Sequence, residues 1–167
     1  NYSDVTNEAI NNIAELSSYI QSLAYKDHYI LNGSREGTYN RLINNYNQLK
    51  VLNKPFTYEY AFLQGELSYK EKFYDQSSKF YLESLGTTEK KKREEFYPKL
   101  FKSMFSLANE KSYNDKKYFE KAYMSYIKWK PKDLETSKQY DVLFKFYMTE
   151  KNMKKVVKLV DYYNKNI

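Results

Sequence analysis

Apolar side chains recur at intervals of three and four residues along most of this 167-residue chain. This spacing is that of one face of an α-helix, which makes a turn every 3.6 residues. The first such stretch begins at Ser3 or Asp4, either of which can cap a helix, and stops between Gly33 and Gly37. With 4 Gly and 3 Pro the chain has few turn residues for an all-β fold, and with 20 Tyr and 10 Phe it is unlike a disordered chain. The pattern predicts an all-α fold.

The helical stretches come in pairs with short connections, so successive helices are expected to be antiparallel neighbours. About eight helices form about four pairs, which recur at roughly the 34- to 40-residue period of helical repeats. The expected pairs cover residues 3–52, 57–86, 88–130 and 134–165, within a single domain that spans residues 1–167.

Three positions give more local expectations. Gly86 closes the second helix of the 57–86 pair and is expected to be its C-cap. Asn114 is expected to cap the helix that precedes Pro131. Pro98 leaves two alternatives open, because a helix can start near it, or it can kink a longer helix that runs through it.

In the stretch GELSYKEKFYDQSSKFYLESLG, residues 65–86, the spacing of Gly65, Ser77, Tyr81 and Ser84 resembles that of a tetratricopeptide repeat (TPR). The resemblance implies that Gly65 lies where two helices cross closely and lets the second helix approach. It also implies that Ser77 and Ser84 are the small positions of that helix and that Tyr81 fills the groove between the helices. The alternative is an unrelated bundle of amphipathic helices, which would share the periodicity but not this spacing.

The last pair also resembles the TPR family. Tyr140, Leu143 and Tyr147 match signature positions of a first helix, while Phe144 stands where Gly or Ala is expected, so the two helices are expected to pack less closely. The core positions of the second helix are expected to be Val156, Val160 and Tyr163. The resemblance implies a right-handed α-solenoid of about four antiparallel helix pairs.

No recognisable reaction is present in the sequence. The lack of Cys excludes disulfides, thiolate catalysis and Cys-ligated metals. The single histidine, His28, lies near a helix end, where a solvated role is expected. The carboxylate pairs Asp4–Glu8 and Glu71–Asp75 have no His or third acid nearby in the sequence to complete a metal site. We expect a non-catalytic protein without cofactor or metal.

A formal net charge of +7 favours acidic partners or anionic surfaces, although both signs are spread along the chain. A run of four cations at a helix start opposes the helix dipole. It is either solvated and compensated by Glu89, Glu94 and Glu95, or a patch for nucleic acid or lipid headgroups. With Arg scarce, nucleic acid is the less favoured partner. The patch consists of Lys90, Lys91, Lys92 and Arg93.

The TPR resemblance implies a scaffold or adaptor that binds a peptide or a partner helix on a concave face lined by the first helix of each pair. Phe62, Tyr69 and Phe105 have an alternative role as core residues between pairs. The candidate partner-binding residues are Glu59, Phe62, Glu66, Tyr69, Lys70, Lys102, Phe105, Asn109, Asp141, Lys145 and Met148.

The cellular context is a broader expectation. The chain begins at Asn1 rather than Met, which suggests an excised fragment. No stretch approaches the roughly 18 apolar residues of a transmembrane helix. The missing Met, together with the general habit of the TPR family, favours a role in bacterial cell-envelope assembly, in the periplasm rather than the cytoplasm, with a protein partner that the sequence does not identify.

Overall fold

A computed structural model of the chain describes residues 57–166. Every regular element within these residues is a helix, which confirms the all-α prediction. The expected first pair, 3–52, lies outside the described residues, as do the Asp4–Glu8 pair and His28.

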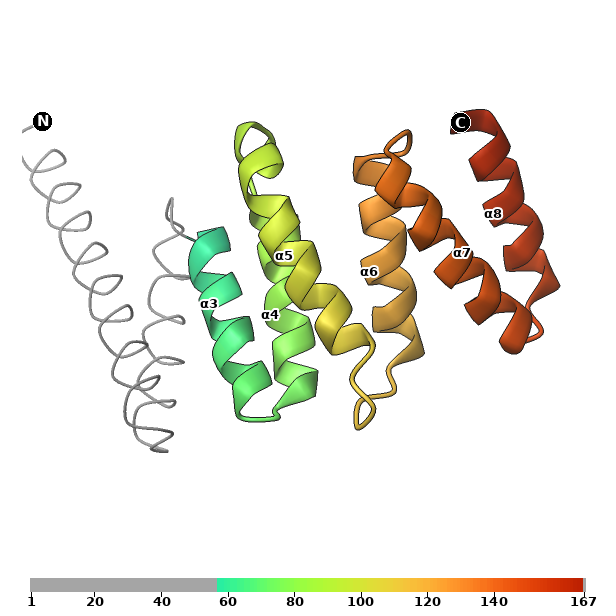
Figure 1. Ribbon diagram of the computed structural model, residues 1–167. Coiled ribbons are helices and arrows are strands. Elements are labelled where there is room, and N and C mark those ends of the chain that lie inside the picture. Colours follow the sequence, from blue (N-terminus) through green and yellow to red (C-terminus); the bar gives the residue numbers. More distant parts are fainter. Residues whose placement is uncertain (1–56, 167) are drawn as a thin grey trace, which may run out of the picture. The chain divides into compact units, whose positions relative to one another are not determined.

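Six α-helices and one short 3₁₀ turn follow one another in the described range (Figure 1). The chain divides into two compact units at the bond between Leu100 and Phe101, which lies inside the helix α5 (Arg93–Ala108). The single-domain organisation stays a prediction, and each unit is described by itself. The elements are α3 (Thr57–Lys70), α4 (Tyr74–Thr87), η1 (Lys90–Lys92), α5 (Arg93–Ala108), α6 (Lys116–Trp129), α7 (Leu134–Thr149) and α8 (Met153–Asn166).

In the first unit, α3 and α4 lie side by side as an antiparallel pair and cross closely at Gly65 (Figure 1). A Cβ atom added to Gly65 would lie 2.5 Å from both Cδ1 and Cε1 of Tyr81. Real Cβ atoms do not approach other heavy atoms so closely, so only glycine fits this position without a shift of the Tyr81 ring. The predicted roles of Gly65 and Tyr81 are confirmed.

The two small residues of α4 are serines, and each hydroxyl has a hydrogen-bond partner on α3. Ser77 Oγ donates to the carbonyl oxygen of Gly65 at 2.8 Å, and Ser84 Oγ donates to that of Tyr58 at 2.7 Å. Both serines are fully buried. Since a buried hydroxyl is costly only when it is unpaired, serine serves here as well as alanine would, and it also joins the two helices.

Aromatic rings pack around this crossing. Tyr81 is fully buried, and its ring centroid lies 6.0 Å from that of Phe62. The start of α5 adds Phe96, whose ring meets the rings of Tyr58 and Phe62 edge to face at centroid distances of 4.9 and 5.5 Å. Edge-to-face pairs add to the gain from burial, so these rings hold α3, α4 and the start of α5 together.

The helix α5 runs from Arg93 to Ala108 with Pro98 inside it, which favours the alternative of a longer helix through the proline. Two expected caps are wrong. Gly86 lies inside α4, because the backbone N–H and Oγ1 of Thr88 both donate to the Ser84 carbonyl and extend the helix. The N-cap of α6 is Asp115 rather than Asn114, since its carboxylate accepts from the backbone N–H groups of Lys117 and Tyr118.

The second unit contains a core built by α6, α7 and α8. The signature residues Tyr140, Leu143 and Tyr147 of α7 are all buried in it, as the sequence predicts. The two helices α7 and α8 approach each other less extensively than α3 and α4, as the sequence predicts, although Phe144 is 39% exposed and so does not act as a spacer in the core. The buried members of the core are Tyr123, Ile127, Tyr140, Leu143, Tyr147, Val156 and Leu159.

The predicted core positions of α8 are only partly right. Val156 is buried, but Val160 and Tyr163 are 41% and 39% exposed, and Leu159 is buried instead. The buried stripe of α8 is therefore rotated toward Leu159 and Tyr162 relative to the predicted one. The last two helices also expose several large apolar side chains: Phe144, Met148, Met153, Val157, Val160 and Tyr163.

The two described glycines make a matched pair for testing the helix crossing. Gly65→Ala should destabilise the protein by about 2 kcal/mol, because the new methyl group overpacks against the buried Tyr81 ring. Gly86→Ala should stabilise it by about 0.5–1 kcal/mol, because a Cβ there has no heavy atom within 4 Å and alanine favours a helix. Chemical denaturation followed by circular dichroism measures both changes, and equal effects would contradict the close crossing.

Candidate functional site

The predicted partner-binding residues of α3 are largely engaged within the first unit. Phe62 is only 6% exposed, which favours its alternative role as a core residue. Glu66 accepts a short hydrogen bond from the Tyr81 hydroxyl, and Glu59 accepts one from Tyr58 at 3.3 Å. Lys70 is exposed at the end of the helix. The ring of the half-buried Tyr69 packs 5.8 Å from that of Tyr74.

The predicted residues of the second unit fall into two groups. Phe105 stacks on Tyr123 with the ring centroids 4.5 Å apart, so it too has a packing role. Lys102 is exposed, and the Asn109 side chain donates to the Tyr123 hydroxyl at 2.8 Å. On α7, exposed Asp141 and Lys145 form an ion pair at 2.6 Å, and Met148 is 45% exposed. A concave face formed jointly by the first helices of both units stays a prediction.

The basic run has partners close to it in sequence. Lys91 pairs with Glu89 at 3.1 Å and Lys92 with Glu95 at 3.8 Å, all on exposed side chains. The Arg93 guanidinium lies 5.7 Å from the Tyr97 ring centroid and donates to the Thr88 carbonyl at 3.4 Å. These contacts favour the alternative in which the run is solvated and neighbouring glutamates compensate its charge. The anion-binding role of the run stays a prediction.

A groove opens between α6 and α8 in the second unit, with α7 at its base. Its volume is about 530 Å³. None of its lining residues was predicted from the sequence as a site residue. We call it the basic groove, and it is lined by Lys117, Glu120, Lys121, Met124, Lys128, Tyr147, Lys155, Lys158, Leu159 and Tyr162.

Helical spacing explains why these residues meet. On α6, Lys117, Lys121, Met124 and Lys128 follow one another at steps of four, three and four, which places them on one face. On α8, Lys155, Leu159 and Tyr162 do the same at steps of four and three. Since α6 and α8 both pack on α7, the two faces border a common space.

The bottom of the basic groove is apolar and its sides are basic. Tyr147 and Leu159 are buried members of the core, and Met124 and Tyr162 are partly buried against it. The sides carry five lysines and one glutamate. A ligand entering the groove would therefore meet hydrocarbon below it and ammonium groups on both sides.

The glutamate is already engaged. Glu120 accepts a hydrogen bond from the Tyr147 hydroxyl at 2.8 Å and forms an ion pair with Lys155. The Lys155 ammonium also lies 5.5 Å from the Tyr147 ring centroid. Burial, together with the nearby Glu120 carboxylate, raises the pKa of Tyr147 well above its usual value. The Tyr147 hydroxyl thus keeps its proton and donates to Glu120 over the whole neutral range.

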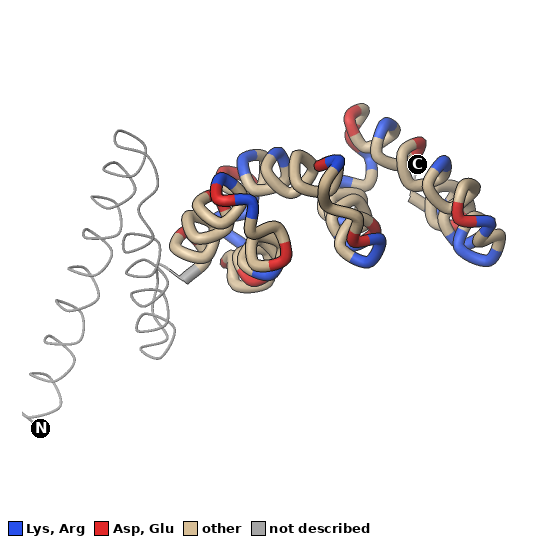
Figure 2. Tube along the Cα trace, turned by 90° about the horizontal axis from the view of Figure 1, so that it is seen from below, with Lys and Arg blue, Asp and Glu red and all other residues tan. Residues whose placement is uncertain are grey.

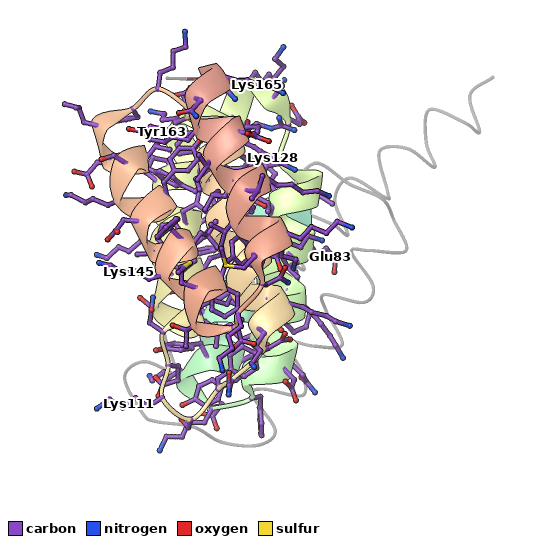
Figure 3. The ribbon with its side chains drawn as sticks, turned by 90° about the vertical axis from the view of Figure 1, so that its right-hand side faces the viewer. Glu83, Lys111, Lys128, Lys145, Tyr163 and Lys165 are labelled. Carbon is purple, nitrogen blue, oxygen red and sulfur yellow. The ribbon has the colours of Figure 1, made fainter. Side chains whose placement is uncertain are left out.

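The other four lysines of the basic groove keep their charge available. No carboxylate of residues 57–166 lies within ion-pair distance of Lys117, Lys121, Lys128 or Lys158. Figure 2 shows charges of both signs along the described helices, but α6 has four lysines and one glutamate, and α8 four lysines and one aspartate. In Figure 3, Lys128 projects on the side of the α7–α8 hairpin opposite to Lys145.

The sequence does contain a signal for this groove. Lysines at helical spacing surround Met124 in the second helix of one pair, and the same arrangement surrounds Leu159 in the second helix of the next. The first helices of the pairs and the consecutive run Lys90–Arg93 do not contain this signal, because the lysines of the basic groove become neighbours only after folding.

Comparisons of the chain with protein-family models, with curated proteins and with solved structures give no match. In the described part of the chain, no cluster of three or more His, Cys, Asp or Glu side chains is placed to hold a metal ion. Among the described helices, none combines the length and the apolarity that crossing a membrane requires.

Two tyrosines of α7 provide a matched test of the contact between Glu120 and Tyr147. Tyr147→Phe removes a hydrogen bond to a carboxylate and should lower the free energy of unfolding by about 1.5 kcal/mol. Tyr140→Phe removes a buried hydroxyl that has no hydrogen-bond partner among the described residues, and should raise it by about 1 kcal/mol. Thermal unfolding at pH 7 distinguishes the two, and a loss of stability in both variants would contradict the assignment.

The buried hydroxyl of Tyr140 also predicts how the stability of the protein changes at alkaline pH. Burial, with smaller effects from Tyr162 and Tyr163, raises the pKa of Tyr140 to about 12, whereas an unfolded tyrosine titrates near 10. Between these values the unfolded chain releases a proton that the folded one retains, so stability is full below about pH 10 and is lost as the pH rises toward 12. Tyr140→Phe should therefore exceed the unchanged protein in free energy of unfolding by more at pH 11 than at pH 7. An equal difference at the two pH values would contradict the raised pKa of Tyr140.

Proposed function

We propose that the chain is a non-catalytic protein-binding module, a scaffold or adaptor that holds a peptide or a partner helix. The observation that carries this proposal is the basic groove, with an apolar floor and lysines on both sides. Ligand sites in proteins are concave, mostly apolar, and carry a few placed polar groups, and the groove has each of these properties. Its residues come from three helices of one packed core, which would hold its shape before a partner binds.

We further propose that the helix pairs belong to a TPR-like α-solenoid. The close crossing of α3 and α4 at Gly65 supports this, as does the burial of Tyr140, Leu143 and Tyr147 at signature positions. The exposed apolar side chains of α7 and α8 also support it, because a hairpin of a repeat protein cannot bury its apolar faces alone. A place in bacterial cell-envelope assembly stays a prediction.

The run Lys90–Arg93 is a weaker candidate for the binding surface than the basic groove. Two of its lysines already have carboxylate partners, and its arginine packs on Tyr97. Exposed ion pairs of this kind contribute little energy, but they reduce the local positive potential. The groove adds an apolar floor, which a side chain of a protein partner can bury.

The proposal is tested by selection from a peptide display library with the full chain as target. We expect selected peptides to bind saturably, with one peptide per chain in calorimetry. Lys121→Glu should weaken this binding about tenfold, because the charge change lies beside the bound peptide. Lys111→Glu is the matched control, since this exposed lysine of the α5–α6 connection makes the same charge change outside the basic groove.

Two further variants examine the face that the TPR resemblance implies. If the first helices bind the partner, Tyr69→Ala and Lys145→Glu should weaken binding, and Lys121→Glu should not. Binding lost only in Lys121→Glu assigns the function to the basic groove. A selection that yields no saturable peptide would rule out the protein-binding function.

A further inference from the structure

We infer that the basic groove recognises an acidic peptide segment that carries apolar anchor side chains, and that this segment binds along the second helices α6 and α8. The inference rests on the proposed protein-binding function and specifies the partner's chemistry. It also moves the binding face away from the first helices, which the TPR resemblance would have favoured.

The excess of positive charge in the basic groove favours an acidic ligand. Lys117, Lys121 and Lys128 on one side and Lys158 on the other have no carboxylate partner among residues 57–166. Like charges gathered around one space raise the local positive potential and favour an anionic ligand. Glu120, the one acid of the basic groove, is paired with Lys155 and accepts from Tyr147, so the four other lysines remain in excess of it.

The apolar floor of the basic groove favours a ligand that also carries apolar side chains. Met124, Tyr147, Leu159 and Tyr162 offer apolar surface between the lysines. A simple polyanion would leave this surface unused, whereas a peptide can bury Leu, Ile, Phe or Met side chains against it. Each fully buried side chain of this kind contributes on the order of 1.5–3 kcal/mol before the costs of binding.

The length of the basic groove along α6 fits a short peptide segment. Lys117 and Lys128 are eleven positions apart on α6, which corresponds to about 16 Å along the helix axis at 1.5 Å per residue. An extended peptide of about five residues covers this length at roughly 3.3 Å per residue. Acidic side chains at the two edges of such a segment would face the lysines, with apolar side chains between them facing the floor.

Lysine rather than arginine lines the basic groove, and this favours a peptide over a nucleic acid. Arg can stack its planar guanidinium group on bases, whereas Lys is a point charge with no plane to stack. No arginine is among the ten lining residues. A membrane surface fits less well, because the apolar floor is recessed below the lysines.

Glu120 gives the inference a distinctive test. Its side chain is 29% exposed at the groove, so its charge faces any bound ligand. Glu120→Gln removes this negative charge and releases Lys155 from its ion pair. Affinity for an acidic segment should therefore rise about three- to tenfold, a change that loss of a purely structural contact would not produce.

The experiment uses the full chain and a display library with seven randomised positions. We expect the selected peptides to be enriched in Asp and Glu and to carry at least one Leu, Ile, Phe or Met. For one such synthetic peptide, the double variant Lys121→Glu/Lys158→Glu should weaken binding by about a hundredfold, about tenfold for each lysine. The control Lys111→Glu/Lys138→Glu, with the same charge change outside the basic groove, should change binding by less than about twofold. Circular dichroism checks that each variant is folded.

Further probes separate the elements of the inference. Replacing the apolar anchors of the selected peptide by Ser should weaken binding, and replacing its acids by Asn or Gln should abolish most of the salt dependence. Selected peptides that are neutral or basic, or that bind the double variant unchanged, would overturn the inference while leaving the protein-binding function in place. Tighter binding of single-stranded oligothymidylate or of anionic phospholipid vesicles, lost in the double variant, would overturn it in favour of a polyanion.

Discussion

The helices of this chain depend on packing against one another. The described α-helices are 14 to 16 residues long, which is close to the length below which isolated helices are marginal in water. Each must bury an apolar stripe on a neighbour to remain folded. At Gly65 this requirement is most severe, because the ring of Tyr81 occupies the space that any side chain would need. The hydroxyls of Ser77 and Ser84 then attach α4 to carbonyl groups of α3.

Such steric requirements are the part of the fold that a sequence predicts well. A small residue at a close crossing has few substitutes, so Gly65, Ser77 and Ser84 could be identified from the resemblance of their spacing to the TPR pattern. Helix ends were less predictable, because neighbouring residues compete as caps. Asp115 follows Asn114 and can reach two backbone N–H groups as a charged acceptor, while Thr88 extends α4 past Gly86 with its own hydrogen bonds. Periodicity alone did not decide which of Leu159 and Val160 is buried, since α8 has apolar residues on more than one face.

The basic groove was not predictable in the same way, because it belongs to no single helix. Its two sides come from α6 and α8, about 30 to 40 positions apart, and they share one space only because both helices pack on α7. Long lysine side chains can lay their methylene groups over apolar surface while the ammonium groups stay in water. The lysines beside Met124 and Leu159 would therefore shield the groove's floor in the free protein, and under the proposed function they would become charge partners in a complex.

The cluster of Glu120, Tyr147 and Lys155 connects this surface to the core. Tyr147 is buried in the same core as Leu143, Val156 and Leu159, and its hydroxyl donates to Glu120, a lining residue of the groove. A shift of α7 within the core would move this donor, and with it the carboxylate that holds Lys155. Since the pKa of Tyr147 is raised by its burial and by Glu120, the donor is retained at every neutral pH. The positions of Glu120 and Lys155 in the basic groove are thus tied to the same packing that stabilises the unit, whereas the four other lysines are placed there only by the helices that carry them.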